Sequence, residues 1–177
     1  ADALLINLGT IDDARIAAIP RVLADASLKQ KPLVLDPVFV QHAPLRLQIA
    51  KQVLAARPLI VKANAEEMRA LAMLHDPKTT WVRTGAVDHI CSAANAIAVH
   101  NGHAWMTAVT GLGCAAGALI AACAAVTDDP DEAALAGMLA HDIAGDAAAK
   151  AAGACGAGRH SGLRSRRRRK SRADLSS

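Results

Sequence analysis

The chain has 177 residues, which suits one domain with a sizeable core. Apolar residues make up 53% of it, yet no apolar run reaches the roughly 20 residues of a membrane-spanning helix, which excludes a membrane span. The net charge of +4 is uneven: residues 159–177 hold eight basic residues and one acidic one, whereas the rest holds 12 basic and 15 acidic residues, a net charge of −3. The body is therefore a mildly acidic globule followed by a basic tail.

Buried strands are predicted where short apolar runs end in a polar or turn-forming residue. These runs are Ala3–Leu8, Pro32–Pro37, Pro58–Lys62 and Thr80–Thr84. Continuous rather than alternating apolar strands favour a parallel sheet covered on both faces. Further along, Ile97–Val99 and Ala104–Thr107 flank Asn101-Gly102, a dipeptide typical of hairpin turns, so a β-hairpin is expected there.

Helices are predicted between the strands and after the last of them. The first starts near Asp12 and has an apolar face from Ile16 to Leu23, and the others cover about 44–56, 65–74, 112–126 and 130–152. Pro20 should bend or shorten the first helix. Asn64 can cap the third helix with Glu67 as its reciprocal partner. The alternation of strands and helices predicts an α/β fold.

The four cysteines, at positions 91, 114, 123 and 155, show no Cys-x-x-Cys spacing. The absence of this spacing argues against a zinc site and against a disulfide scaffold. The sequence begins without a positively charged, apolar leader. We therefore expect reduced thiols and a cytoplasmic location.

The most informative stretch is the Gly-x-Gly turn Gly111-Leu112-Gly113-Cys114, which opens a helix of small residues. Free backbone N–H groups and the helix dipole make such a turn a site for phosphate oxygens. Cys114 stands where its side chain would face a reacting phosphate. The alternative is a glycine-rich turn before a buried helix, with Cys114 a small core residue, because short glycine patterns often match by chance.

Two carboxylates follow predicted strands, at the sheet edge where ligands of open α/β folds bind. Glu67 comes shortly after the strand that ends at Lys62, and there it can hold Mg²⁺ through water and position a nucleotide. Asp36 ends the preceding strand. The alternatives are that Glu67 serves only the helix cap and that Asp36 only forms a turn before Pro37.

His100 and His103 flank Asn101-Gly102 and raise the question of a metal site. No third ligand stands in register with them, so we interpret them as solvated turn residues.

Five segments follow one another in the order of a known family's motifs. They are Leu4–Thr10, Leu35–Val38, Asn64–Glu67, Thr84–Asp88, and Asn101-Gly102-His103 continued by Met106–Cys114. In this order they resemble the hydroxyethylthiazole kinases of the ribokinase-like group, over roughly residues 2–153. The resemblance implies a three-layer α/β/α fold with a mainly parallel central sheet, incomplete at the N-terminus. Residues 1–153 would form a partial kinase domain and 154–177 a basic, disordered tail.

The resemblance also implies an activity: ATP-dependent phosphorylation of the hydroxyl of 4-methyl-5-(2-hydroxyethyl)thiazole, in thiamine biosynthesis and salvage. By this analogy Lys62, in place of an arginine, and Thr84 would bind ATP. Gly111 would border the thiazole pocket, and Cys114 would assist deprotonation of the alcohol.

The remaining roles follow from the same resemblance. The amides of Gly111, Leu112, Gly113 and Cys114 would form the anion hole. Glu67 and Asp36 would organise Mg²⁺. Proteins of this family are typically homotrimers with active sites at the subunit interfaces.

The sequence also departs from the family pattern. The family's N-terminal segment is missing, and the stretch between Leu74 and Thr80 is short. A Ser/Arg tail replaces the glycine-rich segment expected after Gly153. Lys62 is not an equivalent bidentate donor to arginine.

The tail supplies the alternative function. Its basic run, Arg164–Arg172, has a density of like charges that should leave it disordered. It can neutralise the phosphates of a nucleic acid or contact another anionic surface, or it has no specific role. Under this alternative the protein is a catalytically incompetent kinase-fold fragment whose tail binds anionic partners non-specifically.

Overall fold

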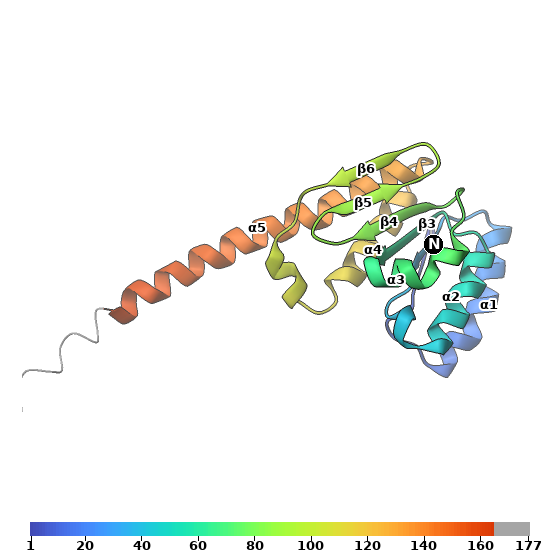
Figure 1. Cartoon of the computed structure of the whole chain (residues 1–177), viewed down its shortest axis with the longest axis horizontal. Helices are drawn as coiled ribbons and strands as arrows, with labels where there is room; N and C mark the ends of the chain where they lie inside the picture. Colours follow the sequence, from blue (N-terminus) through green and yellow to red (C-terminus); the bar gives the residue numbers. More distant parts are fainter. Residues whose placement is uncertain (165–177) are drawn as a thin grey trace, which may run out of the picture.

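The computed structural model describes residues 1–164 and shows a six-stranded sheet between two layers of helices (Figure 1). The strands are β1 (Leu4–Asn7), β2 (Leu33–Asp36), β3 (Ile60–Asn64), β4 (Thr80–Thr84), β5 (Asp88–Cys91) and β6 (Ala96–Val99). The α-helices are α1 (Asp13–Leu28), α2 (Pro44–Ala55), α3 (Ala65–Leu71), α4 (Leu112–Ala124) and α5 (Pro130–Arg164). Short 3₁₀ helices are η1 (Val40–His42), η2 (Ala72–Leu74) and η3 (Ala104–Ala108).

The strands lie in the sheet in chain order, from β1 at one edge to β6 at the other. Strands β1 to β4 are parallel, and β5 and β6 are antiparallel to their neighbours. A helix connects each parallel strand to the next, as a parallel crossover requires. The carboxyl ends of β1 to β4 therefore lie side by side. From here on, the sheet edge means this line of carboxyl strand ends.

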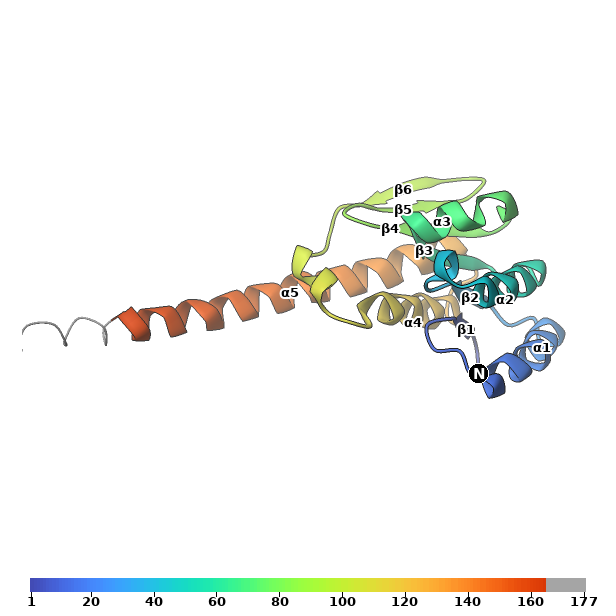
Figure 2. The ribbon, with the colours of Figure 1, turned by 60° about the horizontal axis from the view of Figure 1, so that its bottom comes forward.

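Each face of the sheet has its own apolar core, because alternate side chains point to opposite faces. On one face Leu35, Val61 and Trp81 pack against apolar residues of α1, α2 and α3. On the other face Val34 and Ile60 pack with residues of α4 and α5. Figure 2 shows α4 and α5 on the side of the sheet opposite to α1 and α2. The three-layer α/β/α fold expected from the sequence is thus confirmed.

The prediction of a hairpin around Asn101-Gly102 is wrong. Residues 104–108 form η3 rather than a strand, and the hairpin lies earlier, between β5 and β6. The N–H of Gly102 donates to Asp146 on α5, which draws this loop away from the sheet. The turn of the true hairpin is closed by Ser92, whose backbone N–H donates to the carbonyl of Asn95.

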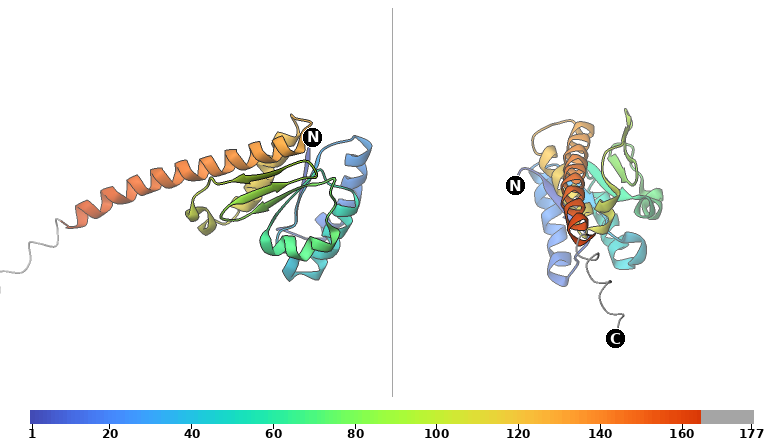
Figure 3. Two further views of the ribbon diagram at one scale, coloured as in Figure 1. Left: turned by 45° about the horizontal axis from the view of Figure 1, so that its top comes forward. Right: turned by 90° about the vertical axis from the view of Figure 1, so that its left-hand side faces the viewer.

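Two helices are longer than predicted. Helix α1 continues through Pro20 to Leu28, so the proline does not shorten it. Helix α5 runs to Arg164, past the expected domain boundary at residue 153, and Figure 3 shows its last turns extending beyond the sheet. Most of the predicted basic tail, residues 165–177, lies outside the described residues. No helix in the described part of the chain has the length and apolar character needed to cross a membrane.

Candidate active site

The polar residues predicted to act in catalysis gather where the carboxyl ends of β1 to β4 meet the start of α4. The strand register places Asn7 beside Asp36 and Asn64 beside Thr84. Helix α4 contacts both β1 and β2. The edge of the sheet and the first turn of α4 therefore form one corner.

Asp36 is the most deeply buried of these groups, with no exposed surface. Its Oδ2 accepts a hydrogen bond from Asn7 Nδ2 at 2.7 Å, and its Oδ1 accepts one from Lys62 Nζ at 3.2 Å. Burial raises the pKa of the Asp36 carboxyl above its usual range, and the nearby Lys62 ammonium only partly offsets this rise. The negative charge of Glu67 raises the same pKa further, because the two carboxylates repel one another.

Lys62 connects this carboxylate to α4. The residue is 5% exposed, and its Nζ also donates to the backbone carbonyl of Gly113 at 2.8 Å. Helix α4 can come this close because it presents glycines. A Cβ at Gly113 would lie 3.4 Å from Lys62 Nζ, and one at Gly117 would lie 3.2 Å from Asp36 Oδ2.

The start of α4 has the features of an anion site. Gly111 precedes the helix with a φ of 92°, which glycine adopts readily, and no described side chain caps the helix. The first backbone bond of the helix joins the Ala115 N–H to the Gly111 carbonyl. The N–H groups of Leu112, Gly113 and Cys114 come before this bond and have no acceptor within the helix. They are the groups expected to bind phosphate oxygens.

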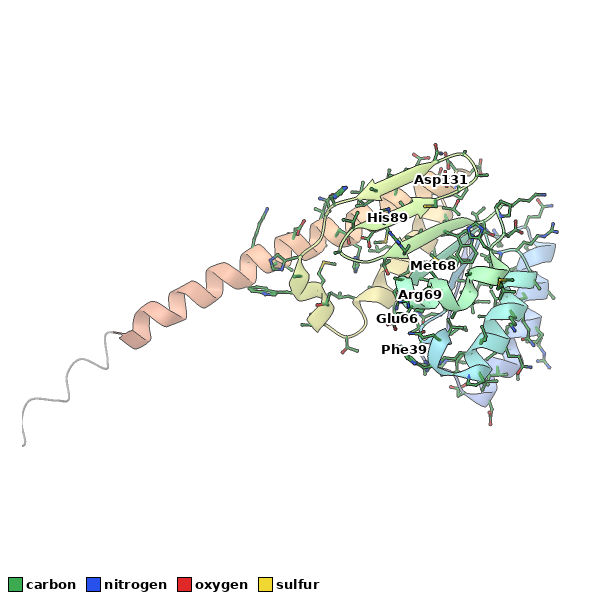
Figure 4. All side chains as sticks on the ribbon, viewed as in Figure 1. Phe39, Glu66, Met68, Arg69, His89 and Asp131 are labelled. Carbon is green, nitrogen blue, oxygen red and sulfur yellow. The ribbon has the colours of Figure 1, made fainter. Side chains whose placement is uncertain are left out.

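Glu67 forms the predicted helix cap. Its Oε2 accepts from the Asn64 N–H at 2.9 Å, while Asn64 Oδ1 accepts from the Glu67 N–H at 3.0 Å. Its Oε1 accepts from the N–H of Phe39 at 2.9 Å, a contact that the sequence did not reveal. Phe39 has a φ of 57°, in the left-handed region of backbone conformation. Figure 4 shows Phe39 and Glu66 near one another at this corner. Glu67 thus fixes the turn after β2 to the start of α3.

Thr84 ends β4 beside Asn64 and is partly exposed. The N–H of the next residue, Gly85, donates to Asp88 Oδ1 at 2.8 Å. Sequence reasoning did not give Asp88 a role at the site, nor Asn7. A polar residue at the end of a buried strand was the available signal for Asn7, since it marks the same edge as Asp36.

The model of the hydroxyethylthiazole kinase family matches residues 1–79 and 73–161. The chain belongs to this family. Its match falls into two parts that overlap at residues 73–79. The overlap lies at the stretch between Leu74 and Thr80 that the resemblance predicts to be short.

Other members of the family are similar over most of this chain. A probable hydroxyethylthiazole kinase of Agrobacterium fabrum is 38% identical over 86% of the chain, and the hydroxyethylthiazole kinase of Granulibacter bethesdensis is 40% identical over 84%. The chain spans 61% and 63% of the lengths of these two relatives. It therefore spans about three fifths of the length of each of these relatives.

Two solved structures share the fold. The hydroxyethylthiazole kinase of Pyrococcus horikoshii OT3 superimposes with a TM-score of 0.71 at 32% identity, over 77% of this chain and 59% of the other. A Bacillus subtilis pyridoxal kinase superimposes with a TM-score of 0.58 at 20% identity, over 78% of this chain and 62% of the other. These similarities confirm the ribokinase-like fold predicted for this family member.

Proposed function

We propose that this kinase-family chain transfers the γ-phosphoryl group of ATP to the primary hydroxyl of hydroxyethylthiazole. The observation that carries the proposal is the position of Lys62. Its ammonium bonds both Asp36 at the sheet edge and Gly113 in the first turn of α4, so the uncapped helix start lies beside the ends of β2 and β3.

The first step rests on the amides of residues 111–114. Their free N–H groups, at the positive end of α4, stabilise the charge that develops on the phosphoryl oxygens during transfer. Phosphoryl transfer needs little covalent chemistry from the protein, so positioning and charge stabilisation supply most of the catalysis. Gly111, the first of these residues, also borders the space for the thiazole.

Cys114 is the proposed acceptor of the alcohol proton, which its sulfur would take up in the thiolate form and hold as the thiol. It lies in the first turn of α4, is a free thiol and is partly exposed. A group at this position lies next to the amides that hold the phosphoryl group, so the alcohol can reach both. Thr84, partly exposed at the end of β4, contacts the nucleotide from the other side of the corner.

Lys62 contributes to ATP binding mainly through its charge. Its Nζ already bonds Asp36 and the carbonyl of Gly113 beneath the amides of the anion hole. A positive charge there attracts phosphate, and the same bonds hold the first turn of α4 in place. A lysine suits this role because it acts as a point charge and needs no bidentate contact.

The carboxylates of this corner fit a magnesium ion that ATP helps to bind. In the described residues no three His, Cys, Asp or Glu side chains could hold a metal by themselves. Mg²⁺ usually keeps several waters and is bound through one or two carboxylates and substrate phosphates. We infer that Glu67, whose oxygens each accept one backbone N–H and have a further lone pair, holds it through water. Asp36 has no exposed surface and acts by charge. When bound, the ion neutralises charge on the phosphates.

We also infer that copies of the chain associate next to this corner, as in a homotrimer. Three large apolar side chains on segments that lead to or from this corner are exposed: Phe39 is 54% exposed, Trp105 54% and Val109 55%. Phe39 follows the end of β2, and Val109 comes shortly before Gly111. Light scattering of a Trp105→Ser variant tests this, because loss of the oligomer is expected and an unchanged mass would contradict it.

We place the reaction in the cytoplasm, where ATP is available and thiols stay reduced. The described cysteines 91, 114 and 123 are free thiols, and Cys114 needs its thiol for the proposed role.

The test of the proposed function is a kinase assay with Mg-ATP and hydroxyethylthiazole that measures the phosphorylated thiazole. The chain is expected to form product, and Cys114→Ala is expected to lower kcat about 100-fold, the usual size of an acid–base contribution. Cys123→Ala is the matched control, since this partly buried cysteine lies on the same helix away from the first turn. Equal rates for the two variants, or product no greater than without protein, would refute the proposal.

A further inference from the structure

Two buried carboxyl groups face one another away from the corner described above. Asp88 begins β5 and Asp142 lies on α5; they are 5% and 3% exposed. Their side chains lie within hydrogen-bonding reach of one another. Oδ2 of Asp142 is buried and has no hydrogen-bond partner among the described groups.

Few charges are available to compensate this pair. His141 Nδ1 lies 3.0 Å from Asp142 Oδ1. The charge of His141 lowers the pKa of Asp88 and is the smallest of the influences on it. Arg83 and His89 are partners in the β4–β5 register. They lie on the other face of the sheet from Asp88, because neighbouring residues of a strand point to opposite faces. One turn further along α5, Asp146 accepts from the N–H of Gly102 and adds negative charge rather than positive.

Among the described residues, the loop between β6 and η3 brings no positive charge to the pair. Asp88 is in register with Val99, the last residue of β6, and the next residue, His100, is exposed to solvent. Nδ1 of His103 accepts from the Trp105 N–H, which engages that ring at the start of η3. A Cβ at Gly102 would lie 3.5 Å from the Asp142 carboxyl, so the loop backbone covers the pair.

Two carboxylates in contact in such a place cannot both be ionised at low cost. Burial, followed by the charge of Asp142, raises the pKa of Asp88 to about 6, against the opposing hydrogen bond from Gly85. A proton between the two carboxyl groups turns their repulsion into a hydrogen bond.

The pair is connected to the proposed nucleotide site. Asp88 Oδ1 accepts from the N–H of Gly85, the residue after Thr84. We propose that Asp88 and Asp142 share a proton, and that this proton keeps Asp88 placed to hold the Thr84–Gly85 turn for nucleotide binding. Asp88 is thus a positioning residue. This inference rests on the proposed function insofar as it concerns ATP.

Asp142→Asn separates this role from a merely structural one, since an asparagine can donate to Asp88 at any pH. Its matched control is Asp146→Asn, one turn along α5 and outside the pair. In assays from pH 5.5 to 8.5, KM for Mg-ATP of the unaltered chain and of the control is expected to rise several-fold above about pH 6, with kcat changed little by comparison. For Asp142→Asn the KM is expected to stay flat. Parallel KM profiles for all three proteins would overturn the inference.

A second measurement needs no nucleotide. Because the folded state binds the proton of Asp88 more tightly than the unfolded state does, stability falls as the pH rises from about 4 to about 6 and stays low above. Asp142→Asn relieves the repulsion, so its Tm is expected to exceed that of the unaltered chain by a few degrees at pH 8 and to match it at pH 5.

The two measurements fail in different ways. Without a pH-dependent Tm difference the shared proton is refuted, whatever the kinase assay gives. If the difference is present but the chain does not bind or turn over Mg-ATP, the proposed function fails, and the positioning role fails with it.

Discussion

The ammonium of Lys62 lies 3.2 Å from Oδ1 of Asp36, with both side chains almost wholly withdrawn from solvent. This ion pair joins the ends of β2 and β3, and through the carbonyl of Gly113 it reaches α4. The pair therefore couples the stability of the sheet edge to the position of the proposed anion hole.

Lys62→Met is expected to destabilise the chain by about 3–5 kcal/mol, because it leaves the Asp36 carboxylate buried without its cation. Urea unfolding measures the change. The matched control is Lys29→Met, whose partner Asp25 is 62% exposed, so a loss under about 1 kcal/mol is expected there. Equal losses in the two variants would contradict the structural role of the buried pair.

Glu67→Gln is expected to cost about 1–3 kcal/mol, because one carboxylate oxygen that accepts a backbone N–H is replaced by an amide that donates. The Mg²⁺ concentration that gives half-maximal kinase activity is also expected to rise. Glu66→Gln removes a neighbouring charge whose contact with Gln41 is exposed, and it should change neither quantity appreciably. A magnesium requirement shifted equally by both variants would argue against a specific role of Glu67.

Asp131 connects α5 to β4 and to the turn between β5 and β6. It accepts hydrogen bonds from Thr80, Ser92 and Asn95, at 2.7, 2.7 and 2.8 Å. Burial raises its pKa, but these hydrogen bonds outweigh burial, and the pKa of the Asp131 carboxyl is lowered overall. The stability that this group contributes is therefore present above its unfolded pKa and lost as the pH falls through the folded one.

Asp131→Ala is accordingly expected to cost about 2–4 kcal/mol near neutral pH, since several donors lose their acceptor and the buried Thr80 hydroxyl is left unpaired. Thermal unfolding across pH 2–7 checks this, and the gap to the unaltered chain should narrow toward the acid end. A gap that widens on acidification would contradict the lowered pKa.

The packing of α4 on α5 depends on Gly137. A Cβ there would lie 2.7 Å from backbone atoms of Ile120, so Gly137→Ala must push the helices apart and is expected to cost about 2 kcal/mol or more. Gly153, on the same helix, has nothing within 4 Å of such a Cβ. Gly153→Ala should stabilise by about 0.5–1 kcal/mol through helix propensity, as chemical denaturation would show. Destabilisation by both would contradict the packing.

The sequence predicted the elements whose signals are local. The runs that became β2 and β3 begin with consecutive apolar residues because both faces of the sheet are covered. The cap of α3 is formed by Asn64 and Glu67, which lie within four residues of one another. The hairpin was misplaced because Asn101-Gly102 is a turn signal in isolation, whereas a long-range bond from Gly102 to Asp146 decides its course.

The site was only partly predictable for the same reason. Asp36, Lys62 and Gly113 were each singled out from strand ends and a glycine turn, but their mutual contact depends on how α4 crosses the sheet. The contact of Asp88 with Asp142 joins residues 54 positions apart, and no local pattern marks it.

The central claim is that Mg-ATP places its phosphates against the start of α4. Its most direct test is a titration of the ¹⁵N-labelled chain with Mg-ATP, followed by amide chemical shifts. The largest shifts are expected for residues 111–114 and for Thr84-Gly85. A cavity of about 380 Å³ lies at the amino ends of the strands and is lined in part by Lys31, Arg57 and Lys78. These basic residues make it the alternative binding site for phosphate. Shifts confined to that cavity, or no shifts at all, would contradict the claim.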